Sequence, residues 1–174
     1  MKSLLQVRDE VLATLDAVDP ARMEAAAAAF ADHGRRWFTS GQGRSRLVAS
    51  MAAMRLMHAG FQVHVVGETT APSIRSGDYL LMLSASGETP VSLHLAGIAA
   101  ELGAGIIAVT TKEDSSLAAL ADIVIPVPVH DSKQFGGSLF EQSALILLDA
   151  LILNLTAGDH HAYEDMRQRH TNLE

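Results

Sequence analysis

Short apolar runs alternate with longer segments of helical character through most of this chain. The runs lack a clean apolar–polar alternation, as strands do when both faces of a parallel sheet are covered. Five runs share these properties: residues 37–39, 63–66, 79–83, 106–109 and 123–127. Helical segments at 45–59, 90–102 and 116–121 separate several of them. This alternation of strand and helix segments predicts a doubly wound, five-stranded parallel sheet with helices on both faces.

Helical patterns flank this predicted core. Apolar residues recur at three- and four-residue steps from Leu4 to Val18, which places them on one helix face. Asp19 and Pro20 then supply an N-cap and a first-turn proline for an alanine-rich helix that reaches residue 31. At 174 residues we expect one domain. Its parts are N-terminal helices at 1–34, an α/β core at 35–155 that ends in a helix over 138–155, and a C-terminal helical tail at 156–174.

The amino-acid composition argues against several classes of partner and of chemistry. The chain has 20 Asp plus Glu against 13 Lys plus Arg, a net charge of −7, which argues against a nucleic-acid partner. It has no cysteine, which excludes a thiol nucleophile, a disulfide and a zinc–thiolate site. Charged residues make up only 19% of the chain and alanine is abundant, so we expect part of the surface to be buried in a homo-oligomer.

The sequence gives no sign of a membrane partner. The longest apolar stretch, residues 144–155, is interrupted by Asp149 and Asn154 and falls short of the ~20 residues that cross a bilayer. The first 18 residues carry five charged side chains instead of the apolar core of a signal peptide. We therefore expect a soluble, cytoplasmic protein.

Two loops of similar composition follow predicted strands. Residues 41–45, Gly-Gln-Gly-Arg-Ser, and residues 84–89, Ser-Ala-Ser-Gly-Glu-Thr, each join an apolar run to a helical segment. Open parallel sheets bind ligands beyond the carboxyl ends of their strands. Bare N–H groups, short hydroxyls and the positive end of a helix dipole suit a phosphate. For the first loop alone, an ordinary glycine turn is an equal alternative.

The first loop fits neither of two common nucleotide motifs. A dinucleotide fingerprint needs a glycine at its sixth position, where this chain has Arg46. A Walker A loop ends in Gly-Lys-Ser or Gly-Lys-Thr, which is absent here. The first loop therefore disfavours these two nucleotide sites and leaves another phosphorylated ligand and an ordinary glycine turn as equal alternatives.

The second loop, Ser-x-Ser-Gly-Glu-Thr at 84–89, resembles the phosphosugar-binding motif of the sugar isomerase (SIS) domain family. Gly-Arg-Ser at 43–45 is similar to that family's other substrate loop, and the resemblance covers about residues 35–155. Four further segments resemble the 6-phospho-3-hexuloisomerases within the family: residues 53–58, 66–69, 137–141 and 169–174. The chain departs from the pattern at Ala85, where many relatives have glycine or glutamine. It departs again at 134–137, where Gln-Phe-Gly-Gly stands in place of an expected Pro-Met-Gly.

The resemblance implies a SIS-type, flavodoxin-like sheet and an isomerase. The implied reaction converts D-arabino-3-hexulose 6-phosphate to fructose 6-phosphate in the ribulose monophosphate pathway, which serves formaldehyde fixation, formaldehyde detoxification or pentose supply. The implied partners are the sugar phosphate, 3-hexulose-6-phosphate synthase as a functional partner, and identical subunits that share active sites in a tetramer or dimer. The reaction takes a proton from C2 and returns one to C3 through a cis-enediol. One carboxylate can do both, so neither a metal nor another cofactor is expected.

Glu141 is the predicted base. It follows Phe140 at the start of an apolar helix, where a carboxylate can be partly desolvated, and the base of SIS isomerases lies near this point. A first-turn glutamate that interacts only with the helix dipole is the alternative. Glu88 is the competing carboxylate, but beside a phosphate it is better suited to bracing the loop. The resemblance implies these substrate-binding residues: Gly43, Arg44, Ser45, Ser84, Ser86, Gly87 and Thr89.

His58 is the second predicted acid–base residue. It lies thirteen residues after Ser45 on one helix, about 20 Å away, so it cannot easily serve a site at the N-terminus of its own helix. SIS isomerases commonly build sites across subunits, so we expect His58 to act in a neighbouring site, with His170 as its rival. Capping the negative end of its own helix is the alternative. The histidines and carboxylates show no spacing that completes a metal site.

Two other functions remain open at this stage. SIS domains also occur as sugar-phosphate sensors, usually joined to a DNA-binding helix-turn-helix, but this chain has no basic segment for that part. The other alternative is a different isomerase of the SIS family, acting on arabinose 5-phosphate or heptose 7-phosphate. Enzymes for arabinose 5-phosphate usually carry nucleotide-binding-type regulatory repeats, which this sequence lacks.

Overall fold

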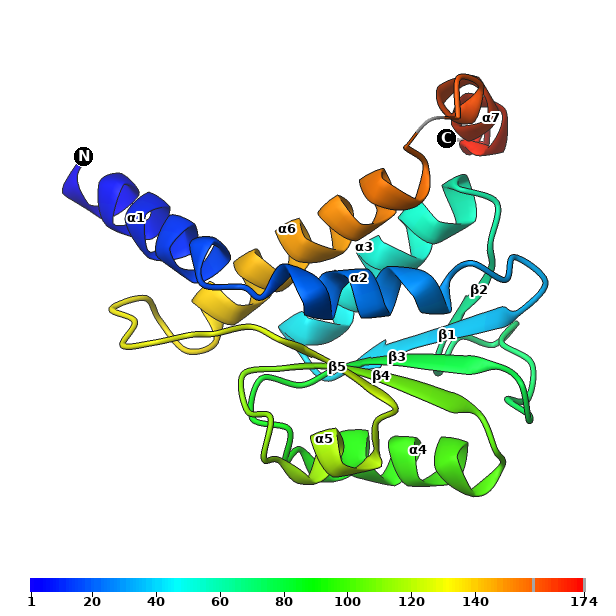
Figure 1. The fold of residues 1–174 in the computed structure, drawn as a ribbon, viewed down its shortest axis with the longest axis horizontal. Helices are drawn as coiled ribbons and strands as arrows, with labels where there is room; N and C mark the ends of the chain where they lie inside the picture. Colours follow the sequence, from blue (N-terminus) through cyan, green and yellow to red (C-terminus); the bar gives the residue numbers. More distant parts are fainter. Residues whose placement is uncertain (158, 174) are drawn as a thin grey trace.

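The computed structural model describes residues 1–157 and 159–173 and contains a five-stranded, all-parallel sheet (Figure 1). The strand order is β2-β1-β3-β4-β5, which is the flavodoxin-like order. The strands are β1 (Arg36–Gly41), β2 (Gln62–Val65), β3 (Tyr79–Leu83), β4 (Gly105–Thr110) and β5 (Ile123–Pro126). The predicted doubly wound sheet is confirmed, with each strand within two residues of its predicted bounds.

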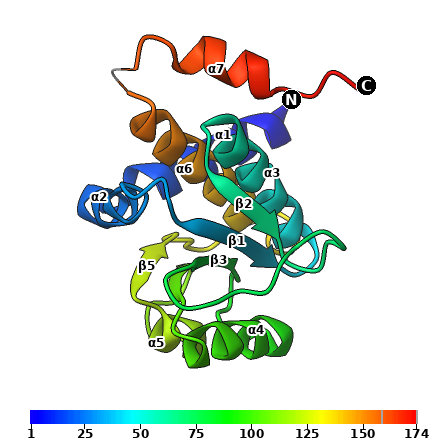
Figure 2. The same ribbon diagram turned by 90° about the vertical axis from the view of Figure 1, so that its right-hand side faces the viewer.

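Helices cover both faces of the sheet. On one face lie α2 (Pro20–Ala29), α3 (Arg44–His58) and α6 (Ser138–Leu155), and on the other lie α4 (Pro90–Glu101) and α5 (Ser116–Leu120) (Figures 1 and 2). Each face has its own cluster of buried apolar side chains. The two remaining helices, α1 (Lys2–Asp16) and α7 (Ala162–Arg169), project from opposite ends of the α3–α6 layer (Figure 1).

The second helix shows how local and tertiary signals combine. The Asp19 carboxylate accepts a hydrogen bond from the Ala21 N–H at 2.9 Å, so the predicted cap is confirmed. The predicted end at residue 31 is wrong, because α2 stops at Ala29. Phe30 leaves the helix to stack on Trp37, with ring centroids 3.7 Å apart, and both rings are buried. Tertiary packing therefore ends this helix before its alanine run would.

Helix α6 has the length and hydropathy of a membrane span. Eight of its residues are nevertheless buried, and it packs against α1, α2 and α3. Within the described part of the chain it is a helix of the protein core.

The topology places two loops side by side. From β1 the chain continues to β2 on one side, and then returns to β3 on the other side of β1. In the register, Gly41 at the end of β1 lies opposite Leu83 at the end of β3. The loops that follow these two strands therefore leave the same edge at the point where the strand order reverses, which is where such sheets bind ligands.

Candidate active site

The loop after β1 makes a tight turn into α3. A Cβ on Gly41 would lie 2.8 Å from the backbone carbon of Ser45, so a side chain there would force the turn open. Gly43 has a φ of +57° and is the N-cap of α3, a conformation that glycine adopts most readily. Arg44 and Ser45 are thereby held in the first turn of α3, with its N–H groups directed beyond the sheet.

The loop after β3 gathers the predicted hydroxyls into one turn. The Ser84 and Thr89 hydroxyls are 3.2 Å apart, and Ser84 is buried. The Ser86 hydroxyl accepts a hydrogen bond from the Glu88 N–H at 3.1 Å. Thr89 is the N-cap of α4 and does not use its side chain as a cap. The turn therefore presents hydroxyls and a helix N-terminus together, a combination suited to an anionic group.

A third loop, between β4 and α5, braces this turn. The carbonyl of Ala85 accepts hydrogen bonds from the hydroxyls of Thr110, at 3.2 Å, and Thr111, at 2.8 Å. A Cβ on Gly87 would lie 2.1 Å from the Ser115 hydroxyl, and Gly87 has a φ of +65°. Thr110, Thr111 and Ser115 were not predicted from the sequence. The hydroxyl-rich stretch directly after the fourth apolar run was the available signal.

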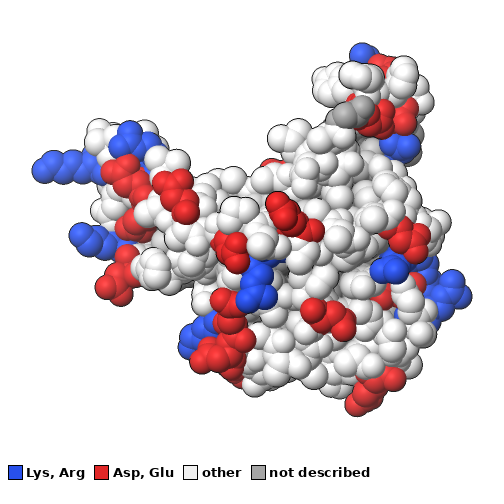
Figure 3. Space-filling view, viewed as in Figure 1, with Lys and Arg blue, Asp and Glu red and all other residues white. Residues whose placement is uncertain are grey.

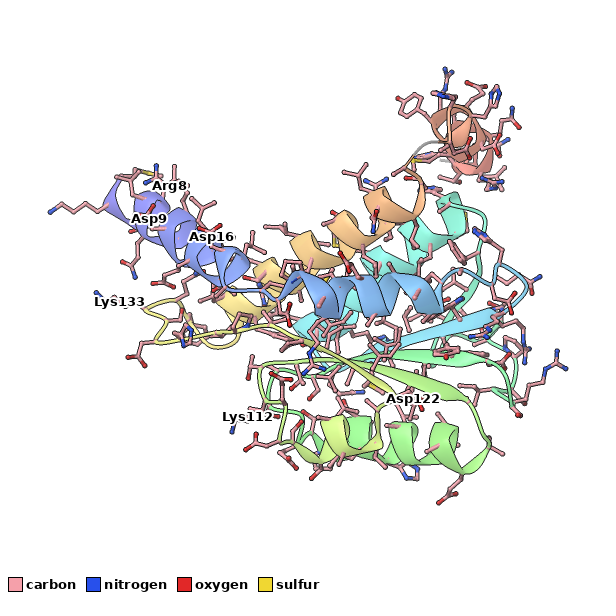
Figure 4. The ribbon with its side chains drawn as sticks, in the orientation of Figure 1. Arg8, Asp9, Asp16, Lys112, Asp122 and Lys133 are labelled. Atoms are coloured by element: carbon pink, nitrogen blue, oxygen red, sulfur yellow. The ribbon has the colours of Figure 1, made fainter. Side chains whose placement is uncertain are left out.

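Glu88 takes the bracing role expected of it. Its carboxylate accepts a hydrogen bond from the Ser116 N–H at 2.7 Å, which ties the β3–α4 loop to the start of α5. Hydrogen bonds from Ser116, with the nearby charge of Lys112, hold the pKa of Glu88 below its ordinary value. Figure 4 shows Lys112 on the β4–α5 loop at this edge of the sheet. Glu88 therefore remains an ionised structural acceptor at neutral pH.

Glu141 lies in the first turn of α6 and pairs with Arg44 across 97 residues of sequence. The Arg44 Nε donates to the Glu141 carboxylate. The Glu141 side chain is only 11% exposed, whereas that of Arg44 is 66% exposed. Both residues line a pocket of about 210 Å³ between α3 and α6, together with Leu47, Met51 and Leu145. The structure thus places a sheltered, oriented carboxylate beside the β1–α3 loop.

The two candidate histidines lie together at the other end of α3. His58 is 2% exposed, and its ring stacks on that of His170 with centroids 5.1 Å apart. Burial first, and then the nearby charges of His170 and Arg55, hold the pKa of His58 below its ordinary value. Within one chain the structure does not bring His58 to Glu141, as the helix length predicts. It brings the two rival histidines into contact instead.

Metal binding has no obvious location in the described part of the chain. Among residues 1–157 and 159–173, no group of three or more His, Asp or Glu side chains is arranged to hold an ion.

Known proteins resemble this chain along most of its length. The SIS domain model matches residues 30–154. A 3-hexulose-6-phosphate isomerase of Mycobacterium gastri is 44% identical, covering 99% of this chain and 90% of its own. The enzyme of the same name from Bacillus subtilis is 40% identical over 83% of this chain and 84% of its own. A crystal structure of a Methanococcus jannaschii protein, for which a 3-hexulose-6-phosphate isomerase function was inferred, superposes with a TM-score of 0.88 at 30% identity over the full length of both chains.

Two glycine substitutions test how the β3–α4 turn is built. Gly87→Ala places a methyl group against Ser115 at a positive φ, so we expect it to lower the free energy of unfolding by at least about 2 kcal/mol. Gly97→Ala is the control, because it lies within α4 and its Cβ would meet no atom within 4 Å. We expect the control to raise stability by about 0.5–1 kcal/mol. Urea unfolding measures both, and equal effects of the two variants would contradict this packing.

Proposed function

Because the chain belongs to the SIS domain family, we propose that it is an isomerase that converts D-arabino-3-hexulose 6-phosphate to fructose 6-phosphate through a cis-enediol. One observation carries this proposal. The Arg44–Glu141 ion pair holds a largely buried carboxylate beside the loops that are suited to binding a phosphate. Two relatives that are 40 and 44% identical are 3-hexulose-6-phosphate isomerases, which supports the same substrate.

The phosphate is bound by the two loops at the switch point. Gly43, Arg44 and Ser45 contribute the N-terminus of α3 and one guanidinium group. The β3–α4 turn contributes the hydroxyls and N–H groups of Ser84, Ser86, Gly87 and Thr89. In binding phosphate, the hydroxyls exchange their present contacts within the turn for contacts with the ligand oxygens. Fixing the phosphate positions the C2–C3 end of the sugar, which is how remote binding energy accelerates a reaction.

Glu141 performs the proton transfers in this proposal. Its carboxylate takes the C2 proton of the ketose and returns a proton to C3 on the same face of the enediol, while the proton of the C2 hydroxyl passes to the C3 oxygen. The Arg44 side chain orients the carboxylate, and its exposed guanidinium can also face the oxygens that gain negative charge in the enediolate. No step requires an electron acceptor, since the oxidation at C2 and the reduction at C3 balance within one molecule.

The setting of the reaction is part of the same proposal. We place the enzyme in the cytoplasm and in the ribulose monophosphate pathway, where 3-hexulose-6-phosphate synthase supplies the substrate for formaldehyde fixation.

We also propose that residues 1–174 form a single SIS domain, which the match of the family model to 30–154 supports. On the face seen in Figure 3, acidic and basic side chains are interspersed and no broad basic surface is visible, which agrees with a small-molecule substrate.

Deuterium incorporation tests the reaction and its base together. In D₂O we expect the wild-type protein to produce fructose 6-phosphate labelled at C3, detected by NMR. Glu141→Gln keeps the shape of the site but removes the base, so we expect kcat to fall by about 10²–10⁴-fold. Glu24→Gln, an exposed carboxylate on α2, is the control and should behave as wild type. The function is wrong if the wild-type protein binds the sugar phosphate without turnover, and the base is wrong if Glu141→Gln retains turnover.

A second copy of the chain completes the site in this proposal. Leu47, Met51, Met54 and Met57 recur along α3 at steps of four, three and three residues, so they share one face, and each is 37–65% exposed. This apolar stripe begins in the pocket beside Glu141 and ends next to His58. If two α3 helices pack antiparallel about a two-fold axis, the histidine end of one meets the Glu141 end of the other. His58 and the exposed His170 would then act across the interface in a dimer or tetramer.

Complementation tests this shared site. Glu141→Gln and His58→Gln variants should each be nearly inactive alone. Refolding a 1:1 mixture should restore about one quarter of wild-type activity, since a quarter of randomly assembled sites receive both intact residues. The same mixture with His170→Gln shows whether that histidine also crosses the interface. A protein that stays at 18.5 kDa by light scattering at all concentrations, or mixtures without recovery, would contradict shared sites.

A further inference from the structure

The carboxylate of Glu10, on the projecting helix α1, is bound to the loop that leads into α6. One of its oxygens accepts hydrogen bonds from the Ser132 hydroxyl at 2.7 Å and from the Gln134 side-chain amide at 3.1 Å. The other accepts from the Lys133 N–H at 3.2 Å and from the side chain of Gln6 at 3.1 Å. Figure 4 shows Lys133 on this loop, beside α1. Residues 132–134 thus all donate hydrogen bonds to the carboxylate of Glu10, which lies 122 to 124 positions earlier in the sequence.

The charge of Glu10 strengthens this contact. Its hydrogen bonds, that from Ser132 most of all, lower the pKa of Glu10 from 4.5 to about 2. The group is therefore ionised at any pH at which the protein would function. Hydrogen bonds to an ionised acceptor are shorter and roughly twice as strong as neutral ones. Such a cluster fixes the loop more firmly than an ordinary surface contact would.

Apolar packing contributes little to fixing residues 131–137, none of which is buried. Phe135, at its tip, is 95% exposed, and Gly136 follows with a φ of +56°. The Ser138 hydroxyl and N–H both donate to the Phe135 carbonyl, at 2.7 and 3.3 Å, which closes a local turn at the start of α6. The hydrogen bonds of Glu10 therefore restrain a segment that apolar packing does not.

The end of the loop lies against the proposed base. The Gly137 carbonyl accepts the Glu141 N–H at 3.1 Å. A Cβ on Gly137 would lie 3.5 Å from one carboxylate oxygen of Glu141, so the loop backbone borders the reacting group itself. A shift of the loop therefore changes the space in which this carboxylate is held.

We propose that Glu10 is a positioning residue for Glu141, acting through residues 132–137 to fix the start of α6 and the orientation of the base. The inference rests on the proposed function, because it takes Glu141 as the base. It assigns a role in the reaction to α1, which lies outside the α/β core. Glu10 touches neither substrate nor the reacting atoms, so its effect is on the proton-transfer step and not on phosphate binding.

Glu10→Gln tests this assignment, because it preserves size while removing the charge. Asp9→Asn is the matched control, since Asp9 is the next residue on the same helix and pairs only with exposed Arg8 among the described contacts. We expect kcat per folded protein to fall by about 10- to 100-fold in Glu10→Gln, since a 1 Å misplacement of a catalytic group costs on the order of 100-fold. The KM should stay within about twofold, because the phosphate loops are untouched. Hydrogen exchange should increase at residues 131–137.

The outcomes separate this inference from the proposed function. Lack of turnover in the wild-type protein contradicts the function itself. An active wild type with equal kcat for Glu10→Gln and Asp9→Asn overturns the role of Glu10, as does a rise in KM at unchanged kcat. Circular dichroism gives the folded fraction. If Glu10→Gln does not fold, Ser132→Ala, which removes the shortest of the hydrogen bonds, must lower kcat in the same way, and wild-type kcat in that variant overturns the proposal.

Discussion

The reversal of strand order at β1 determines where chemistry can occur in this molecule. Parallel strands direct all their carboxyl ends to one edge, and at the β1–β3 boundary, where the strand order reverses, the following loops diverge to opposite faces of the sheet. The β1–α3 loop then leads to the face that also carries α6, while the β3–α4 turn leads to the other face. A ligand at this boundary contacts helix N-termini from both layers. The Arg44–Glu141 pair connects that boundary to the start of α6.

This acidic protein can bind a phosphate dianion because the electrostatic potential at the site is set mainly by the groups nearest to it. The net charge of −7 is spread over the surface, with both signs mixed on the face seen in Figure 3. At the site, the hydroxyls, N–H groups and one exposed guanidinium act within hydrogen-bonding distance, where helix dipoles have their main effect. The two nearby carboxylates already have partners. Glu88 accepts a hydrogen bond from the Ser116 N–H, and Glu141 forms an ion pair with Arg44. Ion pairing and bracing thus reduce the repulsion that a second anion would meet.

Much of the fold could be predicted from the sequence, whereas the roles of the candidate site residues stay predictions. Strand positions followed from apolar runs, because buried parallel strands carry apolar side chains on both faces, and α6 occupies the predicted range of residues 138–155. The end of α2 could not be predicted, since it depends on Phe30 stacking on Trp37. The sequence also does not predict the bracing hydroxyls of Thr110, Thr111 and Ser115 or the contacts of Glu10. Each of these features depends on contacts between loops that are far apart in the chain, and a single sequence does not show which loops come together.

A structure of the protein bound to fructose 6-phosphate tests the central claim most directly. The account predicts the phosphate in the β3–α4 turn, in contact with Ser84, Ser86 and Thr89, and the Glu141 carboxylate within about 3.5 Å of both C2 and C3, as a near-attack geometry requires. A phosphate bound away from this turn, or a sugar whose C2 and C3 lie beyond reach of Glu141, would contradict it.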